Sequence, residues 1–234
     1  GIIRDDVIKC RVSVTDTSSV RISSESTPSA TVGNAIPVVN EVDLSASVDS
    51  DGDAATVQVG DTLECMPTTE DFDGDAVTSS YSWFVNGQAQ SVTIKDLSAG
   101  FSKGDGVYCG VLPNDGLEEG LEVFSPSLTI DNSPPTVSNA AISPSPSPAS
   151  ATELTCSYDF DDIDQDADAS SIVWSVNGTE LGEDSDGDGE SALLSDGYGA
   201  GDTVECTISA NDGSSDGNVE TASTLINQVP VASN

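Results

Sequence analysis

Short runs in which apolar and polar residues alternate recur along the whole chain, and they lie at residues 62–65, 81–85, 107–111 and 204–208. Alternation with a period of two places every second side chain on one face, which is the pattern of a half-buried β-strand. We find no helical periodicity, and turns rich in Gly, Asn, Asp and Ser separate the runs at the spacing typical of a β-sandwich. The sequence therefore predicts an all-β chain.

The runs belong to a repeat of about 95 to 100 residues. Residues 97–105 align without a gap with residues 194–202, and both blocks lead into a Val-x-Cys sequence. A third copy of this block opens the chain at residue 1, and successive units start at Pro37, Pro135 and Pro230. We therefore expect residues 1–32 to be the C-terminal part of one domain, 33–132 and 133–228 to be full domains, and 229–234 to begin another.

The cysteines of each full repeat follow the order Cys, Trp, Cys, with the first Cys 18 residues before the Trp. In the immunoglobulin fold this order accompanies a disulfide that joins two sheets and a Trp that packs on it. We therefore pair Cys65 with Cys109 and Cys156 with Cys206, and we expect Cys10 to have its partner outside the chain. Metal binding or a reactive thiol is the alternative, and the lack of any His and of a Cys-x-x-Cys spacing disfavours zinc. Disulfides indicate an oxidising, extracellular compartment.

Two sequence blocks carry a resemblance to a known family. They are Cys-x17-Trp-x-Val-Asn-Gly and Gly-Asp-x-Val-x-Cys, and they resemble the tandem bacterial Ig-like repeats, related in style to PKD and cadherin-like modules, of large secreted surface proteins. The resemblance implies tandem immunoglobulin-like β-sandwich domains, each with one inter-sheet disulfide, and a structural, spacing or adhesive role. Antibody-type domains have a Tyr two residues before the second Cys, whereas Val107 and Val204 occupy that place here.

The charge of the chain is strongly negative, because 6 Lys and Arg stand against 41 Asp and Glu. Such a surface repels nucleic acid and anionic membranes, and no apolar run reaches the roughly 18 residues that a membrane span needs. We therefore expect no nucleic-acid partner and no membrane insertion in this region. Acidic surfaces attract cations, Ca²⁺ above all, since carboxylate oxygens suit a hard ion. Adaptation to a saline habitat is an alternative explanation of the charge.

Clustered carboxylates recur between the first Cys and the Trp of each repeat, and we predict that they bind Ca²⁺. The members of the two aligned clusters are Glu70, Asp71, Asp73 and Asp75, and Asp161, Asp162, Asp164 and Asp166. A further candidate is formed by Asp184, Asp186 and Asp188, which match the opening of an EF-hand loop but have Ser195 at its twelfth position. Residues 49–53 form another such stretch. Solvated turns are the alternative for all of them, because Asp and Gly favour turns.

Nothing in the sequence favours an enzyme, because it has no His, no candidate triad and no phosphate-binding loop. We predict an extracellular spacer region of a surface stalk, fibre or filament, stiffened by Ca²⁺. Its partners would be neighbouring repeats and, in a filament, identical chains. The alternative is an adhesin or a carbohydrate-binding module of a large secreted protein, which would expose aromatic residues on one face.

Overall fold

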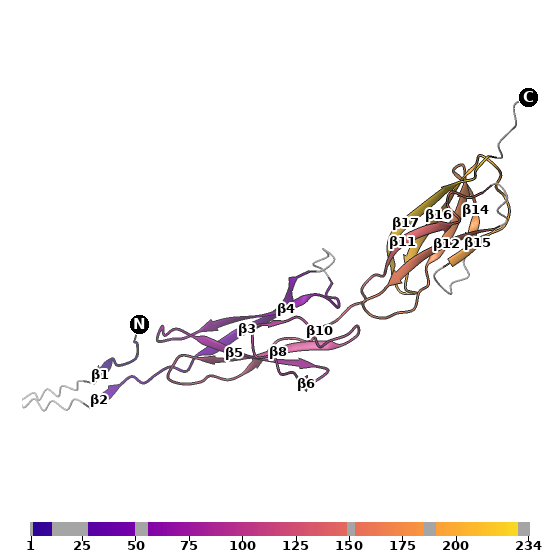
Figure 1. The fold of residues 1–234 in the computed structure, drawn as a ribbon. Helices are drawn as coiled ribbons and strands as arrows, with labels where there is room; N and C mark the ends of the chain where they lie inside the picture. The colour runs from indigo at the N-terminus through magenta and orange to yellow at the C-terminus, as the bar shows by residue number, and fades with distance from the viewer. Residues whose placement is uncertain (1, 11–27, 50–55, 149–152, 185–190, 229–234) are drawn as a thin grey trace, which may run out of the picture. The chain divides into compact units, whose positions relative to one another are not determined.

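The computed structural model describes residues 2–10, 28–49, 56–148, 153–184 and 191–228. Each regular element in these ranges is a β-strand, and none of them contains a helix that could cross a membrane. Contacts divide the chain into two compact units (Figure 1). Unit 1 comprises Gly1–Ala54, Asp61–Gly100 and Asp105–Thr129, and unit 2 comprises Ala55–Gly60, Phe101–Gly104 and Ile130–Asn234.

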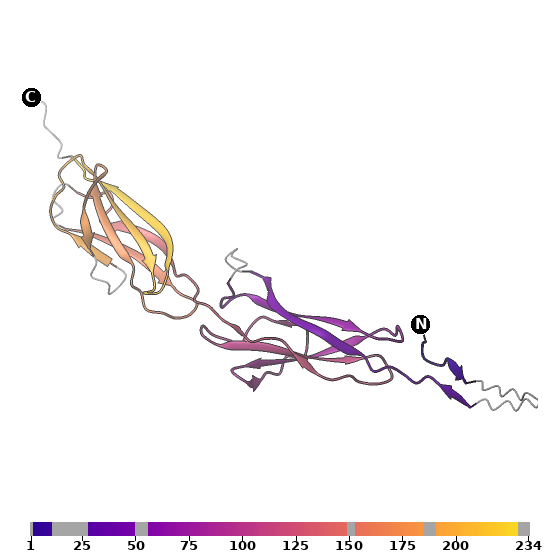
Figure 2. The same cartoon turned by 180° about the vertical axis from the view of Figure 1, so that it is seen from behind.

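Unit 1 is built from two antiparallel sheets (Figure 2). One sheet has the order β3-β4-β7, with bounds Val38–Val48, Thr62–Glu70 and Asp96–Leu97. The other has the order β10-β8-β5-β6, with bounds Leu128–Thr129, Gly106–Asn114, Thr78–Val85 and Gln88–Ala89, and β9 (Val123–Phe124) also pairs with β8. A separate pair joins β1 (Val7–Lys9) to β2 (Ser29–Thr31).

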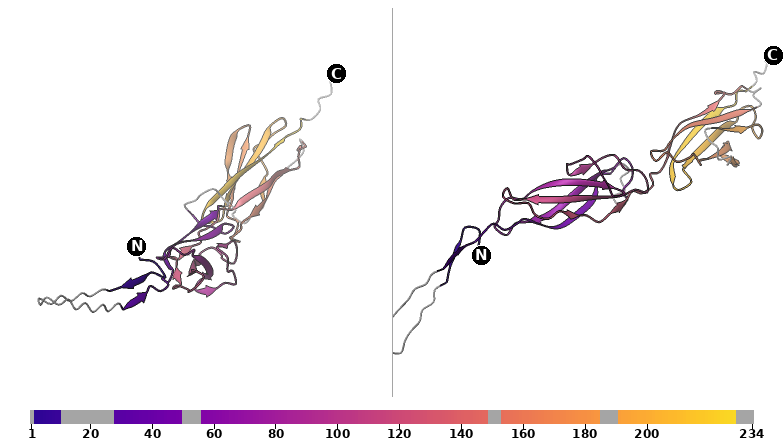
Figure 3. Two further views of the ribbon diagram at one scale, coloured as in Figure 1. Left: turned by 90° about the vertical axis from the view of Figure 1, so that its left-hand side faces the viewer. Right: turned by 90° about the horizontal axis from the view of Figure 1, so that it is seen from below.

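Unit 2 is likewise built from two sheets (Figure 3), and its hydrogen-bonded strand order corresponds to that of unit 1. Its three-stranded sheet is β11-β12-β15, with bounds Thr136–Ser143, Leu154–Asp161 and Ser191–Leu194. Its four-stranded sheet is β14-β13-β16-β17, with bounds Thr179–Asp184, Ser171–Val176, Thr203–Asn211 and Asp216–Leu225. In both units the first Cys lies in the three-stranded sheet and the second in the larger sheet, which has five strands in unit 1 and four in unit 2.

The disulfides join the two sheets of each unit. Cys65 on β4 is bonded to Cys109 on β8, and Cys156 on β12 is bonded to Cys206 on β16. All four sulfur-bearing residues are buried, and alternate residues of the same strands are buried with them, as the sequence pattern requires. The prediction of tandem Ig-like β-sandwiches, each with one inter-sheet disulfide, is confirmed. Cys10 is a free, exposed cysteine.

The tryptophans pack beside the disulfides. Trp83 on β5 is the cross-strand partner of Cys109, and Trp174 on β13 is the partner of Cys206. Cross-strand partners share one face of the sheet, so each indole lies next to its sulfur bridge. Trp83 is 0% exposed and Trp174 is 3% exposed. Both are core residues, and neither offers a ring face to a sugar.

The two Asn-Gly hairpins are present where the sequence places them. Asn86 and Gly87 join β5 to β6, and Asn177 and Gly178 join β13 to β14. Their φ angles are all positive, at 50° and 76° in unit 1 and at 50° and 79° in unit 2. Two consecutive residues with positive φ match the twist of the flanking strands, which explains why Asn and Gly stand there.

Candidate functional site: an acidic loop and a basic side chain in each unit

The acidic loop of unit 1 follows β4 directly. Asp71 Oδ1 accepts hydrogen bonds from the backbone amides of Asp73 (2.8 Å) and Asp75 (3.1 Å), which curls the loop around one carboxylate. Gly74 between them has a φ of 82°, which L side chains rarely adopt. The loop brings one carboxylate oxygen from each of the three aspartates within 4.8 Å of the others. Unit charges at that separation repel by about 3 kcal/mol at an effective dielectric constant of 20.

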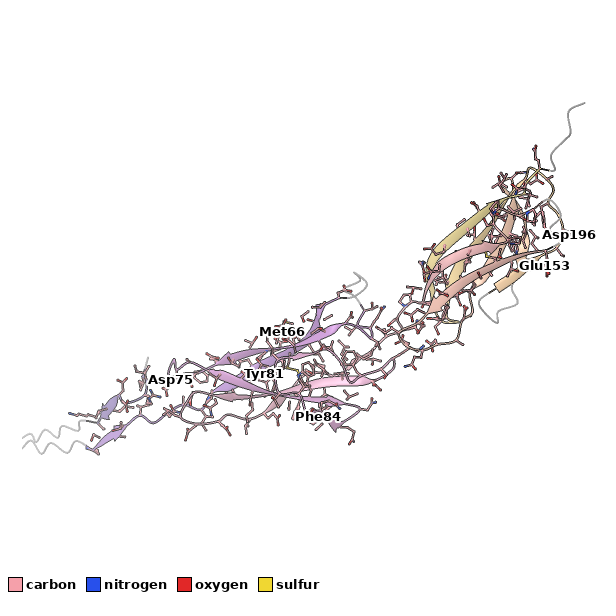
Figure 4. All side chains as sticks on the ribbon, viewed as in Figure 1. Met66, Asp75, Tyr81, Phe84, Glu153 and Asp196 are labelled. Carbon is pink, nitrogen blue, oxygen red and sulfur yellow. A yellow bond between two sulfur atoms is a disulfide. The ribbon has the colours of Figure 1, made fainter. Side chains whose placement is uncertain are left out.

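A basic side chain lies against this loop. Arg4 forms an ion pair with Asp75, and its Nη1 also donates to Asn34 Oδ1 at 2.9 Å. The backbone amide of Arg4 donates to Asp73 Oδ1 at 3.1 Å. The Arg4 side chain is about one-third exposed, so this pair is partly shielded from water. Figure 4 labels Asp75 at the end of the unit 1 sandwich that is nearest to the pair of strands β1 and β2.

Asn34 connects this ion pair to a second turn of unit 1. Its Nδ2 donates to Asp115 Oδ2 at 2.7 Å, and the next amide, that of Ala35, donates to Asp73 Oδ2 at 2.6 Å. Asp115 Oδ1 also accepts from the backbone amides of its own turn, including that of Glu118 at 2.7 Å. The Glu118 amide and the Asn34 side chain lower the pKa of Asp115 because they stabilise its charged form.

Unit 2 contains the same arrangement around a lysine. Lys103 forms an ion pair with Asp166 and donates from Nζ to Asn132 Oδ1 at 2.7 Å. Asn132 Nδ2 donates to Asp212 Oδ2 at 2.8 Å, and the Ser133 amide donates to Asp164 Oδ2 at 2.6 Å. We call this set the polar network; its members are Arg4, Asn34, Asp73, Asp75 and Asp115 in unit 1, and Lys103, Asn132, Asp164, Asp166 and Asp212 in unit 2.

The loop of unit 2 folds as its counterpart does. Asp162 Oδ1 accepts from the amides of Asp164 (2.7 Å) and Asp166 (3.2 Å), and Gln165 has the positive φ, 65°, that Gly74 has in unit 1. The carboxylates within 4.8 Å of one another are those of Asp162, Asp166 and Asp212. The hydrogen bond to Asp166 raises the pKa of Lys103, so the lysine stays charged.

Asp212 is buried, and its ionisation is strongly favoured. Burial alone would raise its pKa, but the Asn132 side chain and the amides of Ser215 and Ser214 outweigh that effect and lower the pKa to about 2. Carboxylates with lowered pKa values stay ionised at neutral pH and hold cations and N–H donors. A general acid for glycoside hydrolysis needs the opposite shift, so the lowered pKa of Asp212 favours contacts with cations and N–H donors.

The structure gathers some of the predicted metal-site residues and leaves others apart. Asp71, Asp73 and Asp75 come together, and so do Asp162 and Asp166. Glu70 is exposed, and its carboxylate accepts a hydrogen bond from Asn40 Nδ2 at 3.4 Å. The backbone oxygen of Asp161 accepts a hydrogen bond from the Thr136 hydroxyl at 3.4 Å. Of the EF-hand-like candidate, Asp184 ends β14, and Asp186 and Asp188 lie outside the described residues. Most of the stretch 49–53 also lies outside them.

Sequence reasoning missed the basic residue and the asparagine, although both repeat in the chain. An Asn lies three residues before each repeat-opening proline, at Asn34, Asn132 and Asn227. Arg4 and Lys103 each lie three residues after a glycine that the repeat alignment superposes, Gly1 and Gly100. These two coincidences were the available signal. These residues lie close to the acidic loop only in the folded chain, and the sequence alignment does not contain that proximity.

An aromatic cluster lies on the outer face of the five-stranded sheet of unit 1. Phe84 and Tyr108, which are cross-strand partners, stack with ring centroids 4.8 Å apart and an interplanar angle of 8°. Phe124 meets both edge-on, at 5.7 and 6.0 Å. Phe84 is labelled in Figure 4. In unit 2 the corresponding partners are Ser175 and Glu205, so the same face is polar there.

Comparisons with known proteins give only remote likenesses. No protein-family model matches the chain, and no curated protein matches it by sequence. Fibronectin(III)-like modules of Clostridium thermocellum CbhA are 11% identical over 80% of this chain and 94% of theirs, with a TM-score of 0.30. The chicken CNTN1 FN1–FN3 domains are 12% identical over 97% and 79%, with a TM-score of 0.33. The chicken interferon gamma receptor alpha chain is 12% identical over 83% and 100%, with a TM-score of 0.43. Because these scores are below 0.5, the fold assignment rests on strand order and disulfides.

Proposed function

We propose that this chain is a structural spacer within an extracellular surface protein, such as a stalk, a fibre or a filament. The observation that carries the proposal is the repetition of one design: the same strand order, the same inter-sheet disulfide and the same polar network occur in both units. Repetition of a complete structural unit is typical of a spacer, because each added copy lengthens the protein without adding a new kind of site. Disulfides of this kind persist in oxidising compartments, which supports an extracellular location.

The partners we propose are neighbouring repeats of the same protein and, in a filament, identical chains. This fits the resemblance to tandem bacterial Ig-like repeats of secreted surface proteins. An adhesin or carbohydrate-binding role has less support, because both Trp residues are buried and the faces of Phe84 and Tyr108 cover each other. A sugar platform needs ring faces that are open to the ligand.

Calcium binding by the acidic loops stays a prediction. What favours it is a set of buried carboxylate oxygens with no hydrogen-bond partner among the described residues: Asp71 Oδ2, Asp162 Oδ2 and Asp164 Oδ1. Buried charged oxygens without a donor or a cation are costly. Against it stands the basic side chain that already contacts Asp75 in one loop and Asp166 in the other.

The test is to pull the full chain by its two ends in a force spectrometer. A load-bearing spacer should show discrete unfolding events, one for each unit. The bond between Cys65 and Cys109 spans 44 residues and that between Cys156 and Cys206 spans 50. Each bond therefore keeps about 150 to 170 Å of extended chain from lengthening under force. Reduction of the bond should increase the length gained in the corresponding unfolding event by that amount. Smooth extension without discrete events, before and after reduction, would contradict the proposal.

A further inference from the structure

The basic residues of the polar networks occupy equivalent positions in a chain that has very few of them. Only 6 of 234 residues are Lys or Arg, and two of these six lie at the position three residues after the repeat glycine. Both contact the last aspartate of an acidic loop, Asp75 or Asp166, and both contact the side-chain oxygen of the repeated asparagine. The third copy of this turn has Ala200 at the same position, so it offers no cation there.

Each basic side chain contacts a carboxylate of the acidic cluster, which is where a bound metal ion would lie. Asp166 is one of the three residues whose carboxylate oxygens lie within 4.8 Å of one another in unit 2, and Lys103 Nζ holds one of its oxygens. The loop amides donate to Asp162 Oδ1, and the Ser133 amide donates to Asp164 Oδ2. Asp162 Oδ2 and Asp164 Oδ1 are buried and have no hydrogen-bond partner within the described part of the chain. A carboxylate cluster with one oxygen taken by an ammonium group has one ligand fewer for a divalent ion, and the ammonium also repels that ion.

We propose that Arg4 and Lys103 are tethered cations that compete with divalent ions for the acidic loops, so that each loop is closed by a basic side chain of this chain itself. The bridging asparagine positions that side chain, because its oxygen accepts from the cation while its amide is held by Asp115 or Asp212. The residue three positions after the repeat glycine then determines whether a loop is closed by the chain (Arg or Lys) or left for an ion from solution. This inference does not depend on the spacer function.

The experiment compares calcium binding by the wild-type chain, Lys103→Met and Lys95→Met. Methionine keeps the length and packing of the lysine stem and removes its charge. Lys95 is the matched control, because it also pairs with a carboxylate, Glu64, but lies away from the acidic loops. Both variants change the net charge equally. Binding is measured by calorimetric titration with CaCl₂, and the melting temperature is recorded in chelator and in CaCl₂.

In chelator, K103M should melt below the wild type, by about 4 °C or more, because Asp166 and Asn132 lose their donor. In CaCl₂ it should regain that loss, with a calcium affinity about 10-fold or more above that of K95M. A double variant, K103M/D166N, should lose the gain in affinity. If K103M binds calcium no better than K95M, the tethered-cation proposal is wrong. It is equally wrong if K103M binds calcium more weakly than the wild type, since the lysine then does not compete.

Discussion

Removal of one disulfide should destabilise its own unit and leave the other unchanged. The variant is Cys65→Ala with Cys109→Ala, which deletes the bond between β4 and β8 and removes both of its sulfur atoms, so that neither partner is left as a buried thiol. The bond closes a segment of 44 residues. Limiting the unfolded chain over that length contributes about 4 kcal/mol in the chain-entropy model. Both cysteines are essentially fully buried beside Trp83, so the lost sulfur contacts add to the effect.

The assay is urea unfolding followed by Trp fluorescence, because each unit contains one tryptophan of the core. In a Trp174→Phe background the signal comes from Trp83, and it therefore reports on unit 1. With a typical urea dependence of about 2 kcal/mol per molar, a loss of about 4 kcal/mol lowers the midpoint of unit 1 by about 2 M. Unit 2, followed through Trp174 in a Trp83→Phe background, serves as the internal control because its own bond, Cys156–Cys206, is intact.

Two results would refute this reasoning. A loss below about 1 kcal/mol in unit 1 would mean that the bond does not limit the unfolded state as the loop length implies. An equal loss in unit 2 would mean that the units do not unfold separately, contrary to their separate cores. In the first case the disulfide could no longer be treated as a main source of the stability of unit 1, and in the second case the two units could no longer be treated as independent.

The remaining predictions concern pH and close backbone contacts. Because the pKa of Asp212 is lowered to about 2 in the folded state, its contribution is fully present above its unfolded value of about 4 and is lost as pH falls toward 2. The free energy of unfolding of unit 2, measured from its urea midpoint, should therefore fall by about 1 to 2 kcal/mol below pH 4, and this fall should be absent in Asp212→Asn. Gly120→Ala and Gly217→Ala should each cost about 2 to 3 kcal/mol by calorimetry, because an added Cβ would lie 2.2 Å from the Pro37 oxygen and 1.8 Å from the Pro135 oxygen. Gly33→Ala, where nothing lies within 4 Å, is the control and should change stability by less than about 0.5 kcal/mol.

The parts of the structure that sequence reasoning predicted well depend on short-range pattern or on repetition of spacing. The strands follow from alternation, and the Asn-Gly hairpins follow from the φ angles that those residues tolerate. The disulfide between Cys65 and Cys109 follows from an order of residues that two repeats share. The acidic loop is local as well, since Asp71 organises it through amides only two and four residues away.

The polar network could not be predicted in the same way, because its contacts are distant in sequence. Asn34 lies 81 residues from Asp115, and Asn132 lies 80 residues from Asp212. No residue propensity and no sequence period links such positions. They come together because the folded sandwich places their turns next to each other. The pairing of Lys103 with Asp166, 63 residues away, likewise depends on where the fold places two segments. A sequence shows that these residues recur, and the structure shows that they recur together.

The pleat of the larger sheet in each unit has a consequence for how such a protein diversifies. Trp83 and Val85 face the interior, whereas Phe84 between them faces outward, next to Tyr108. At the outward positions unit 2 carries Ser175 and Glu205 while its interior keeps Trp174 and Cys206. Substitutions at inward and outward positions of one strand therefore have separate effects. The inward residues maintain the core, whereas the outward residues can be replaced or can form new contacts without disturbing it. A duplicated unit can therefore change its exterior completely while its interior stays the same.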